Sequence, residues 1–198
     1  MVIKRQLLIA AFLLGCNLAF AQTACLGQLS AAAQLLTRQH VVYDPAYYSI
    51  PYPNGDIPQG KGVCTDVIIR AYRQLGIDLQ KEVHLDMVAN FNLYPNQWGL
   101  SRTDRNIDHR RVPNLMVFFT RKGTKLSVSQ VADDYKPGEI VCWNLGGGIT
   151  HIGIVTDNKS TDGRRHLIAH NIGAGQVLED CLFKFKIIGH YQYCPQQP

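Results

Sequence analysis

The sequence lacks the features that mark several special classes of protein. Charged residues make up 18% of the 198 residues and hydrophobic residues 46%, which excludes a disordered chain. The net charge is +5, and Lys and Arg are not gathered into one basic tract, so nucleic acid is not an expected partner. There is no internal repeat and no low-complexity segment. The length suits a single globular domain.

Long apolar runs are lacking as well, with one short exception near the N-terminus. Leu7–Leu14 is unbroken by any polar residue, follows two basic residues, and precedes Ala19-Phe20-Ala21, a small-x-small pattern. The run is shorter than the about 20 residues that a membrane-spanning helix needs. We therefore expect residues 1–21 to be a secretory signal peptide. Residues 22–198 would form a periplasmic or secreted bacterial protein without a transmembrane segment.

A second processing route is open. Leu13-Leu14-Gly15-Cys16 resembles a bacterial lipobox, in which Cys16 becomes the lipidated first residue of a lipoprotein. We favour cleavage after Ala21, because its small-x-small match is clean, whereas Leu14 is a poor lipobox residue.

Cysteine is too scarce for a disulfide scaffold, since the chain has only six. Loss of Cys16 with the signal peptide would leave an odd number, so at least one thiol would have no intramolecular partner. The sequence does not assign the disulfide pairing among Cys25, Cys142, Cys181 and Cys194.

Helical patterns come first in the chain and strand patterns later. Apolar spacing predicts helices over residues 26–40, 64–75, 83–91 and 113–122. Runs rich in Val, Ile, Tyr and Phe predict strands over residues 139–145, 150–157, 166–172 and 184–193. Gly146-Gly147-Gly148 is expected to form a tight hairpin. This order predicts an α+β domain in which N-terminal helices pack on a C-terminal antiparallel β-sheet. The most charged stretch, residues 101–112, is expected at the surface.

Cys64 is the candidate nucleophile. It follows Gly60-Lys61-Gly62-Val63 and begins a predicted helix, where unpaired N–H groups and the helix dipole favour a thiolate. Glycines before it would let a substrate approach closely. The alternative is that Cys64 is a small buried hydrophobic residue or half of a disulfide.

Two histidines are candidates for the base and its orienting group. His151 begins one predicted strand and His170 lies in the next. If these strands pair across residues 158–165, both imidazoles face the same side of the sheet, as thiol catalysis requires. The remaining histidines are interpreted as structural: His40, His84, His109, His166 and His190.

Together these motifs resemble the NlpC-like cell-wall cysteine peptidases, a papain-like family of secreted bacterial enzymes. The motifs occur in the family's order over residues 43–175: Gly62-Val63-Cys64-Thr65-Asp66, Lys136-Pro137-Gly138-Glu139-Ile140-Val141, Thr150-His151-Ile152-Gly153-Ile154-Val155, and His170. The resemblance implies a papain-like α+β fold, with no metal or organic cofactor.

The resemblance also implies a role for each site residue. Cys64 would be the nucleophile, His151 the general base and His170 the orienting residue. The backbone N–H of Cys64 would contribute to the oxyanion hole. Tyr52 has the spacing of a tyrosine that binds the substrate or polarises its carbonyl.

The chain departs from that family's pattern at two points. The usual Cys-Ser-Gly is Cys64-Thr65-Asp66 here, and a charged segment over residues 91–112 reads as an insertion. Both resemble a branch with a Gly-Val-Cys-Thr-Asp signature. Asp66 is a candidate for the substrate-binding or oxyanion region. It could instead favour the helix N-terminus, and its charge would raise the pKa of a nearby thiol.

The implied function is hydrolysis of an amide bond in peptidoglycan stem peptides, by an endopeptidase or amidase that is a monomer. Its partner would be peptidoglycan or a muropeptide. The alternatives are an acyltransferase, an ester or lipid hydrolase, or a wall-binding module in which Cys64 is inert. Remodelling of its own wall, attack on a competitor, and control by an inhibitor or immunity protein all stay open. Zinc is disfavoured, because no pair has C-x-x-C or H-x-x-x-H spacing.

Overall fold

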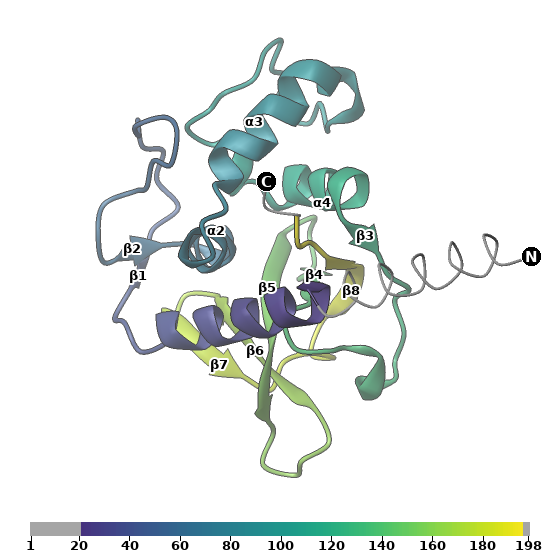
Figure 1. Cartoon of the computed structure of the whole chain (residues 1–198). Helices are drawn as coiled ribbons and strands as arrows, with labels where there is room; N and C mark the ends of the chain where they lie inside the picture. Colours follow the sequence, from purple (N-terminus) through teal and green to yellow (C-terminus); the bar gives the residue numbers. More distant parts are fainter. Residues whose placement is uncertain (1–20, 196–198) are drawn as a thin grey trace, which may run out of the picture.

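The computed structural model describes residues 21–195, which form an α+β fold (Figure 1). An N-terminal helix covers residues 21–36. The later helices are α2 (Cys64–Gln74), α3 (Leu79–Asn90) and α4 (Val112–Lys122), and the 3₁₀ turns are η1 (Phe91–Leu93), η2 (Asp108–Arg110) and η3 (Ala132–Asp134). The prediction of an α+β domain is confirmed. The predicted signal peptide, including Cys16, lies outside the described residues except for Ala21.

Six strands form one antiparallel sheet in the order β3-β8-β4-β5-β6-β7. Their bounds are β3 (Thr124–Lys125), β4 (Ile140–Asn144), β5 (Thr150–Lys159), β6 (His166–Asn171), β7 (Gln176–Glu179) and β8 (Lys186–Gln192). A separate parallel pair joins β1 (Val42–Tyr43) to β2 (Lys61–Gly62) just before α2. The hairpin predicted at Gly146-Gly147-Gly148 connects β4 and β5, and all three glycines have positive φ.

The sheet has an apolar layer on each face. On one face, α2 packs on β5 and β6. The core there includes Val67 and Ile68 from the helix and Ile152 and Ile154 from β5. A smaller cluster covers the other face, with residues from the sheet and from the segments before β4 and before β8: Tyr135, Val141, Trp143, Val155, Ile168, Cys181, Leu182 and Ile187. Because neighbouring residues of a strand point to opposite faces, β5 contributes to both layers.

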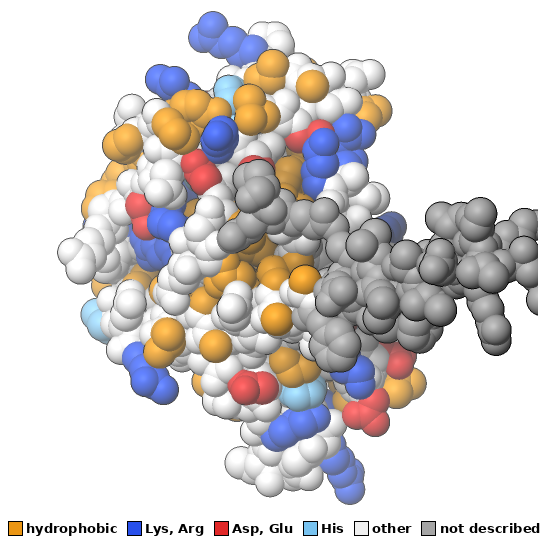
Figure 2. Space-filling model, viewed as in Figure 1, with side chains coloured by type: hydrophobic (Ala, Val, Ile, Leu, Met, Phe, Trp, Pro, Cys, Tyr) orange, Lys and Arg blue, Asp and Glu red, His pale blue; other side chains and the backbone are white. Residues whose placement is uncertain are grey.

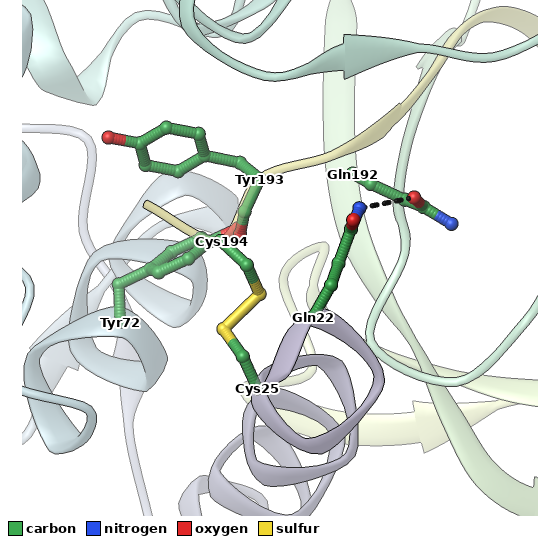
Figure 3. Close-up of a disulfide and its surroundings, with 6 residues drawn as sticks. All are labelled: Gln22, Cys25, Tyr72, Gln192, Tyr193 and Cys194. Atoms are coloured by element: carbon green, nitrogen blue, oxygen red, sulfur yellow. Dashed lines mark hydrogen bonds between the residues drawn. A yellow bond between two sulfur atoms is a disulfide. The ribbon is translucent and has the colours of Figure 1, made fainter. Parts of the chain in front are cut away.

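A disulfide joins the two ends of the described chain. Cys25 of the N-terminal helix is bonded to Cys194, which lies 169 residues later and just beyond β8 (Figure 3). Beside it, Gln22 Nε2 donates to Gln192 Oε1 over 3.0 Å. The structure thus assigns a pairing that the sequence left open, and Cys64, Cys142 and Cys181 are free and buried.

The surface gives no sign of a basic stripe on the face shown in Figure 2, where Lys and Arg side chains are dispersed. Within residues 21–195, every helix is too short or too polar to cross a membrane. The expected absence of a transmembrane segment therefore holds for the part of the chain that the structure describes.

Candidate functional site

Cys64 is the first residue of α2, and Val63 before it is extended. The thiol is nearly buried, with 8% of the residue exposed. The backbone N–H groups of Ile152 on β5 and of Thr65 are placed to donate to its sulfur. The thiol therefore lies at a helix N-terminus and against the strand residue that follows His151.

The pairing of β5 with β6 brings His151 and His170 together. Ile154 is paired with Ala169, so Gly153 lies beside His170, and a Cβ at Gly153 would be 3.2 Å from the Cβ of His170. His151 is two residues before Gly153 and points to the same face. Its Nε2 is 2.9 Å from Nδ1 of His170. The prediction that both imidazoles face the same side of the sheet is confirmed.

A carboxylate continues this row of side chains. His170 Nε2 is 3.0 Å from Oε2 of Glu179, and the other carboxylate oxygen accepts from Lys184 Nζ over 2.8 Å. Glu179 ends β7 and is paired with Ile168, which makes it the diagonal neighbour of His170 on the same face.

Glu179 is a site residue that sequence reasoning missed, because β7 is not among the predicted strands. The strand is only four residues long and follows two glycines with positive φ, Gly173 and Gly175. The available signal was the sequence Gln-Val-Leu-Glu after Gly175, which can return as a hairpin strand beside the one that carries His170.

Trp143 supports the His151 ring from the neighbouring strand. The two residues are paired in the β4–β5 ladder, and their ring centroids are 5.8 Å apart. The indole N–H donates to the carbonyl oxygen of Leu182 over 2.9 Å, which fixes the ring in the core. The imidazole of His151 thus lies between the Trp143 ring and His170.

Burial keeps the thiol and the imidazoles neutral. It lowers the pKa of His151 to about 3 and also lowers that of His170, although the charge of Glu179 opposes both shifts. Burial raises the pKa of Cys64 to about 12, and the charge of Asp66 adds to this. Within residues 21–195, no hydrogen bond joins the Cys64 sulfur to the His151 ring. At rest the thiol and both imidazoles are neutral, and the sulfur contacts the backbone of β5 rather than an imidazole.

Asp66 is occupied by structural contacts. Its Oδ2 accepts from the backbone N–H of Val63 over 2.7 Å at the start of α2. Both carboxylate oxygens also accept hydrogen bonds from the guanidinium of Arg110, over 2.9 and 3.0 Å. Thr65 adds a third link, since its hydroxyl donates to the carbonyl oxygen of Arg110 over 3.1 Å. The two residues after Cys64 therefore hold η2 against the N-terminus of α2.

The expectation that residues 101–112 form a surface segment is wrong at η2. Asp108, His109 and Arg110 are only 1%, 2% and 7% exposed. Burial lowers the pKa of His109 to about 3, which keeps it neutral. The physical reason is pairing: Arg110 is buried with Asp66, and Asp108 accepts from the backbone N–H of Asp104.

A cleft of about 230 Å³ opens beside Cys64. It is lined by Tyr43, Pro45, Val63, Cys64, Gln97, Trp98, Ile107, Arg110, Arg111, Val112, Pro113 and Thr150. The guanidinium of Arg111 stacks 4.1 Å from the centroid of the Trp98 ring. The charged segment thus contributes one wall of the cleft.

Tyr52 is not among the residues that line this cleft. Its ring packs edge-on against His84, with centroids 5.1 Å apart, and Arg105 lies over its face. Tyr43 lies in the cleft instead, and its pKa is raised by burial and by the nearby Cys64 and Asp66. The substrate-binding role of Tyr52 stays a prediction.

One group of side chains has the composition of a metal site. Potential ligand atoms of His170, Glu179 and Cys181 lie within 4.8 Å of one another. These atoms are hydrogen-bonded to one another, however, because His170 Nε2 contacts both Glu179 and the Cys181 sulfur. Burial also raises the pKa of Cys181 to about 12, whereas a metal needs the thiolate. We interpret the group as a hydrogen-bonded cluster.

Replacement of Asp66 by asparagine is expected to destabilise the fold strongly. Asp66→Asn would leave the buried Arg110 without a counter-charge, which typically costs about 3–5 kcal/mol. Asp56→Asn is the matched control, because Asp56 also binds two arginines but its side chain is 36% exposed. Its loss should cost about 1 kcal/mol or less. Urea unfolding measures both, and equal losses would contradict the structural role of Asp66.

Alkylation of Cys64 is expected to depend steeply on pH. Because its pKa is raised to about 12, the rate with iodoacetamide should rise about tenfold per pH unit between pH 7 and 9. The Cys64→Ser variant provides the background from the other free cysteines. A reaction plateau between pH 4 and 7 would show a preformed thiolate and contradict the neutral resting state.

Comparison with known proteins assigns the family. The chain is 52% identical over 151 residues to the "Uncharacterized protein YijF" of Escherichia coli (strain K12), covering 76% of this chain and 73% of that protein. No solved structure matches. The match over residues 30–193 is to a domain of unknown function, DUF1287, and not to a cell-wall peptidase family. Identification as a member of the NlpC-like peptidases is therefore wrong, and the chain belongs to the DUF1287 family.

Proposed function

We propose that this protein is a thiol hydrolase that cleaves an amide bond by means of Cys64, His151 and His170. One observation carries the proposal: the thiol begins α2 and meets the backbone of β5 at Ile152, directly after His151, whose ring is hydrogen-bonded to a second histidine. Nucleophile, base and orienting group are the constellation that covalent thiol catalysis needs.

The reaction begins from neutral groups. As the Cys64 sulfur attacks the carbonyl carbon, His151 accepts the thiol proton, and the carbonyl π electrons move to oxygen. The N–H of Cys64, at the start of α2 where it has no partner within the helix, donates to that oxyanion. The imidazolium then protonates the leaving amine as the C–N bond breaks. Water, deprotonated by His151, attacks the thioester, and the thiol leaves with the proton restored.

The cleft supports a peptide that carries a carboxylate as the substrate. Arg111 places a cation on its wall and is also paired with Asp108 over 3.1 Å, and the rings of Trp98 and Tyr43 offer apolar surface. Peptidoglycan stem peptides combine amide bonds with free carboxylates, and they lie where an exported bacterial protein would meet them. The disulfide between Cys25 and Cys194 favours an oxidising compartment such as the periplasm. The proposal therefore names stem peptides as the substrate of a periplasmic or secreted monomer.

We extend the proposal to the fold, which we assign as papain-like. A helix with the nucleophile at its N-terminus packs on an antiparallel sheet that supplies the base, which is the arrangement of papain-like hydrolases. Acyl transfer or ester hydrolysis would use the same residues, and the identity of the bond broken separates them from amide hydrolysis.

A non-catalytic module is the second candidate, because one observation favours it. The pKa of Cys64 is raised rather than lowered, as in an inert buried cysteine. Such a protein would bind wall material in the cleft without breaking a bond.

Digestion of purified sacculi followed by mass spectrometry of the released muropeptides tests the proposal. The wild-type chain is expected to release products with a new amine and a new carboxylate. Cys64→Ala and His151→Ala should lower the rate by about 100-fold or more, because each removes a group that acts in the transition state. The assay also identifies the amide that is cut.

Cys142→Ala is the control, because Cys142 is another free buried cysteine that the mechanism does not use. It should retain activity within about threefold. Hydrolysis that survives in Cys64→Ala would overturn the mechanism. Binding of sacculi without any released product would favour the wall-binding module.

A further inference from the structure

We propose that Glu179 is a positioning residue that fixes which ring nitrogen carries the proton, first in His170 and through it in His151. The inference rests on the proposed function, because it makes His151 the base for Cys64. The tautomers themselves can be observed without any activity.

Glu179 is ionised. Its pKa is lowered by the hydrogen bond from Lys184 and by the neighbouring His170. An ionised carboxylate only accepts hydrogen bonds. The 3.0 Å contact with Oε2 therefore requires that His170 Nε2 carries a proton and donates it.

Both imidazole rings are neutral, which fixes the remaining donors and acceptors. Burial lowers the pKa of His170, so the ring has one proton, and its Nδ1 must be an acceptor. The 2.9 Å contact then requires His151 Nε2 to donate. A neutral His151 with its proton on Nε2 has its lone pair on Nδ1, which is the form that can accept the proton of Cys64.

The groups around the two rings favour the same assignment. Glu179 is the only carboxylate that contacts them among residues 21–195, and Lys184 holds its second oxygen. Cys181, whose sulfur is 3.6 Å from His170 Nε2, is a protonated thiol, because burial raises its pKa to about 12. The carboxylate of Asp66 is paired with Arg110.

The isosteric variant Glu179→Gln should reverse the order of donors. Lys184 can only donate, so it would take the single amide oxygen and leave the NH₂ group facing His170 Nε2. His170 Nε2 must then accept, which moves its proton to Nδ1. His151 Nε2 in turn accepts, and the proton on His151 Nδ1 abolishes its function as a base.

Long-range ¹H–¹⁵N NMR of the histidine side chains at pH 7 tests the inference on the full chain. In the wild type, both His151 and His170 should show the Nε2–H tautomer. Glu179→Gln should convert both to the Nδ1–H tautomer. With the sacculi assay it should also lower kcat by about 100-fold, with KM within about twofold.

Asp180→Asn is the matched control, because it removes the same charge at the next residue, which is exposed and paired with Arg165. It should leave the tautomers and kcat unchanged. In Glu179→Gln/Lys184→Met the amide is free to turn its oxygen toward His170, so the Nε2–H tautomers and part of the activity should return.

Nδ1–H tautomers in the wild type, or Nε2–H tautomers that persist in Glu179→Gln, would overturn the inference. These outcomes are distinct from a failure of the proposed function, which would show as correct tautomers in a wild-type chain that releases no product.

Discussion

The register of three neighbouring strands is the constraint on which the candidate site depends. Pairing of β5 with β6 and of β6 with β7 puts His151, His170 and Glu179 on one face, each a diagonal neighbour of the next. A shift of one residue in either ladder would turn one of these side chains to the opposite face. Gly153 keeps the row close, because a Cβ there would lie 2.5 Å from Cγ2 of Ile168. Strand pairing in the sheet thus sets the spacing of the three hydrogen-bonded side chains.

The start of α2 joins this row to the rest of the molecule. Cys64, Thr65 and Asp66 are consecutive: the thiol contacts β5, and the next two side chains both hold η2. A buried ion pair is a poor source of net stability, because both charges lose their hydration. Its value here is positional, since Arg110 brings the charged segment to the edge of the cleft beside Cys64.

Local patterns in the sequence were sufficient for most of the fold. The helix that begins at Cys64, the glycine hairpin and the strands that carry both histidines were predicted, because each depends on periodicity or turn chemistry within a few residues. Residues 108–110 were misplaced, since burial of charge there depends on Asp66, more than 40 residues earlier. Glu179 was missed because its strand is short and is specified by pairing rather than by its own composition.

The resemblance to cell-wall peptidases shows the limit of motif order as evidence for a family. The same motifs occur in a chain of the DUF1287 family, and the geometry alone supports the chemistry. The strongest part of that geometry is the hydrogen-bonded row of His151, His170 and Glu179. No motif predicted Glu179.

Acylation of Cys64 is the step on which the proposed chemistry depends. Mass spectrometry of the protein, quenched in acid within seconds of mixing with muropeptides, detects this step. We expect an added acyl mass on the peptide that contains Cys64, lost on treatment with hydroxylamine and absent from Cys64→Ala. Product formation without any adduct on Cys64, or with the adduct on another residue, would contradict it.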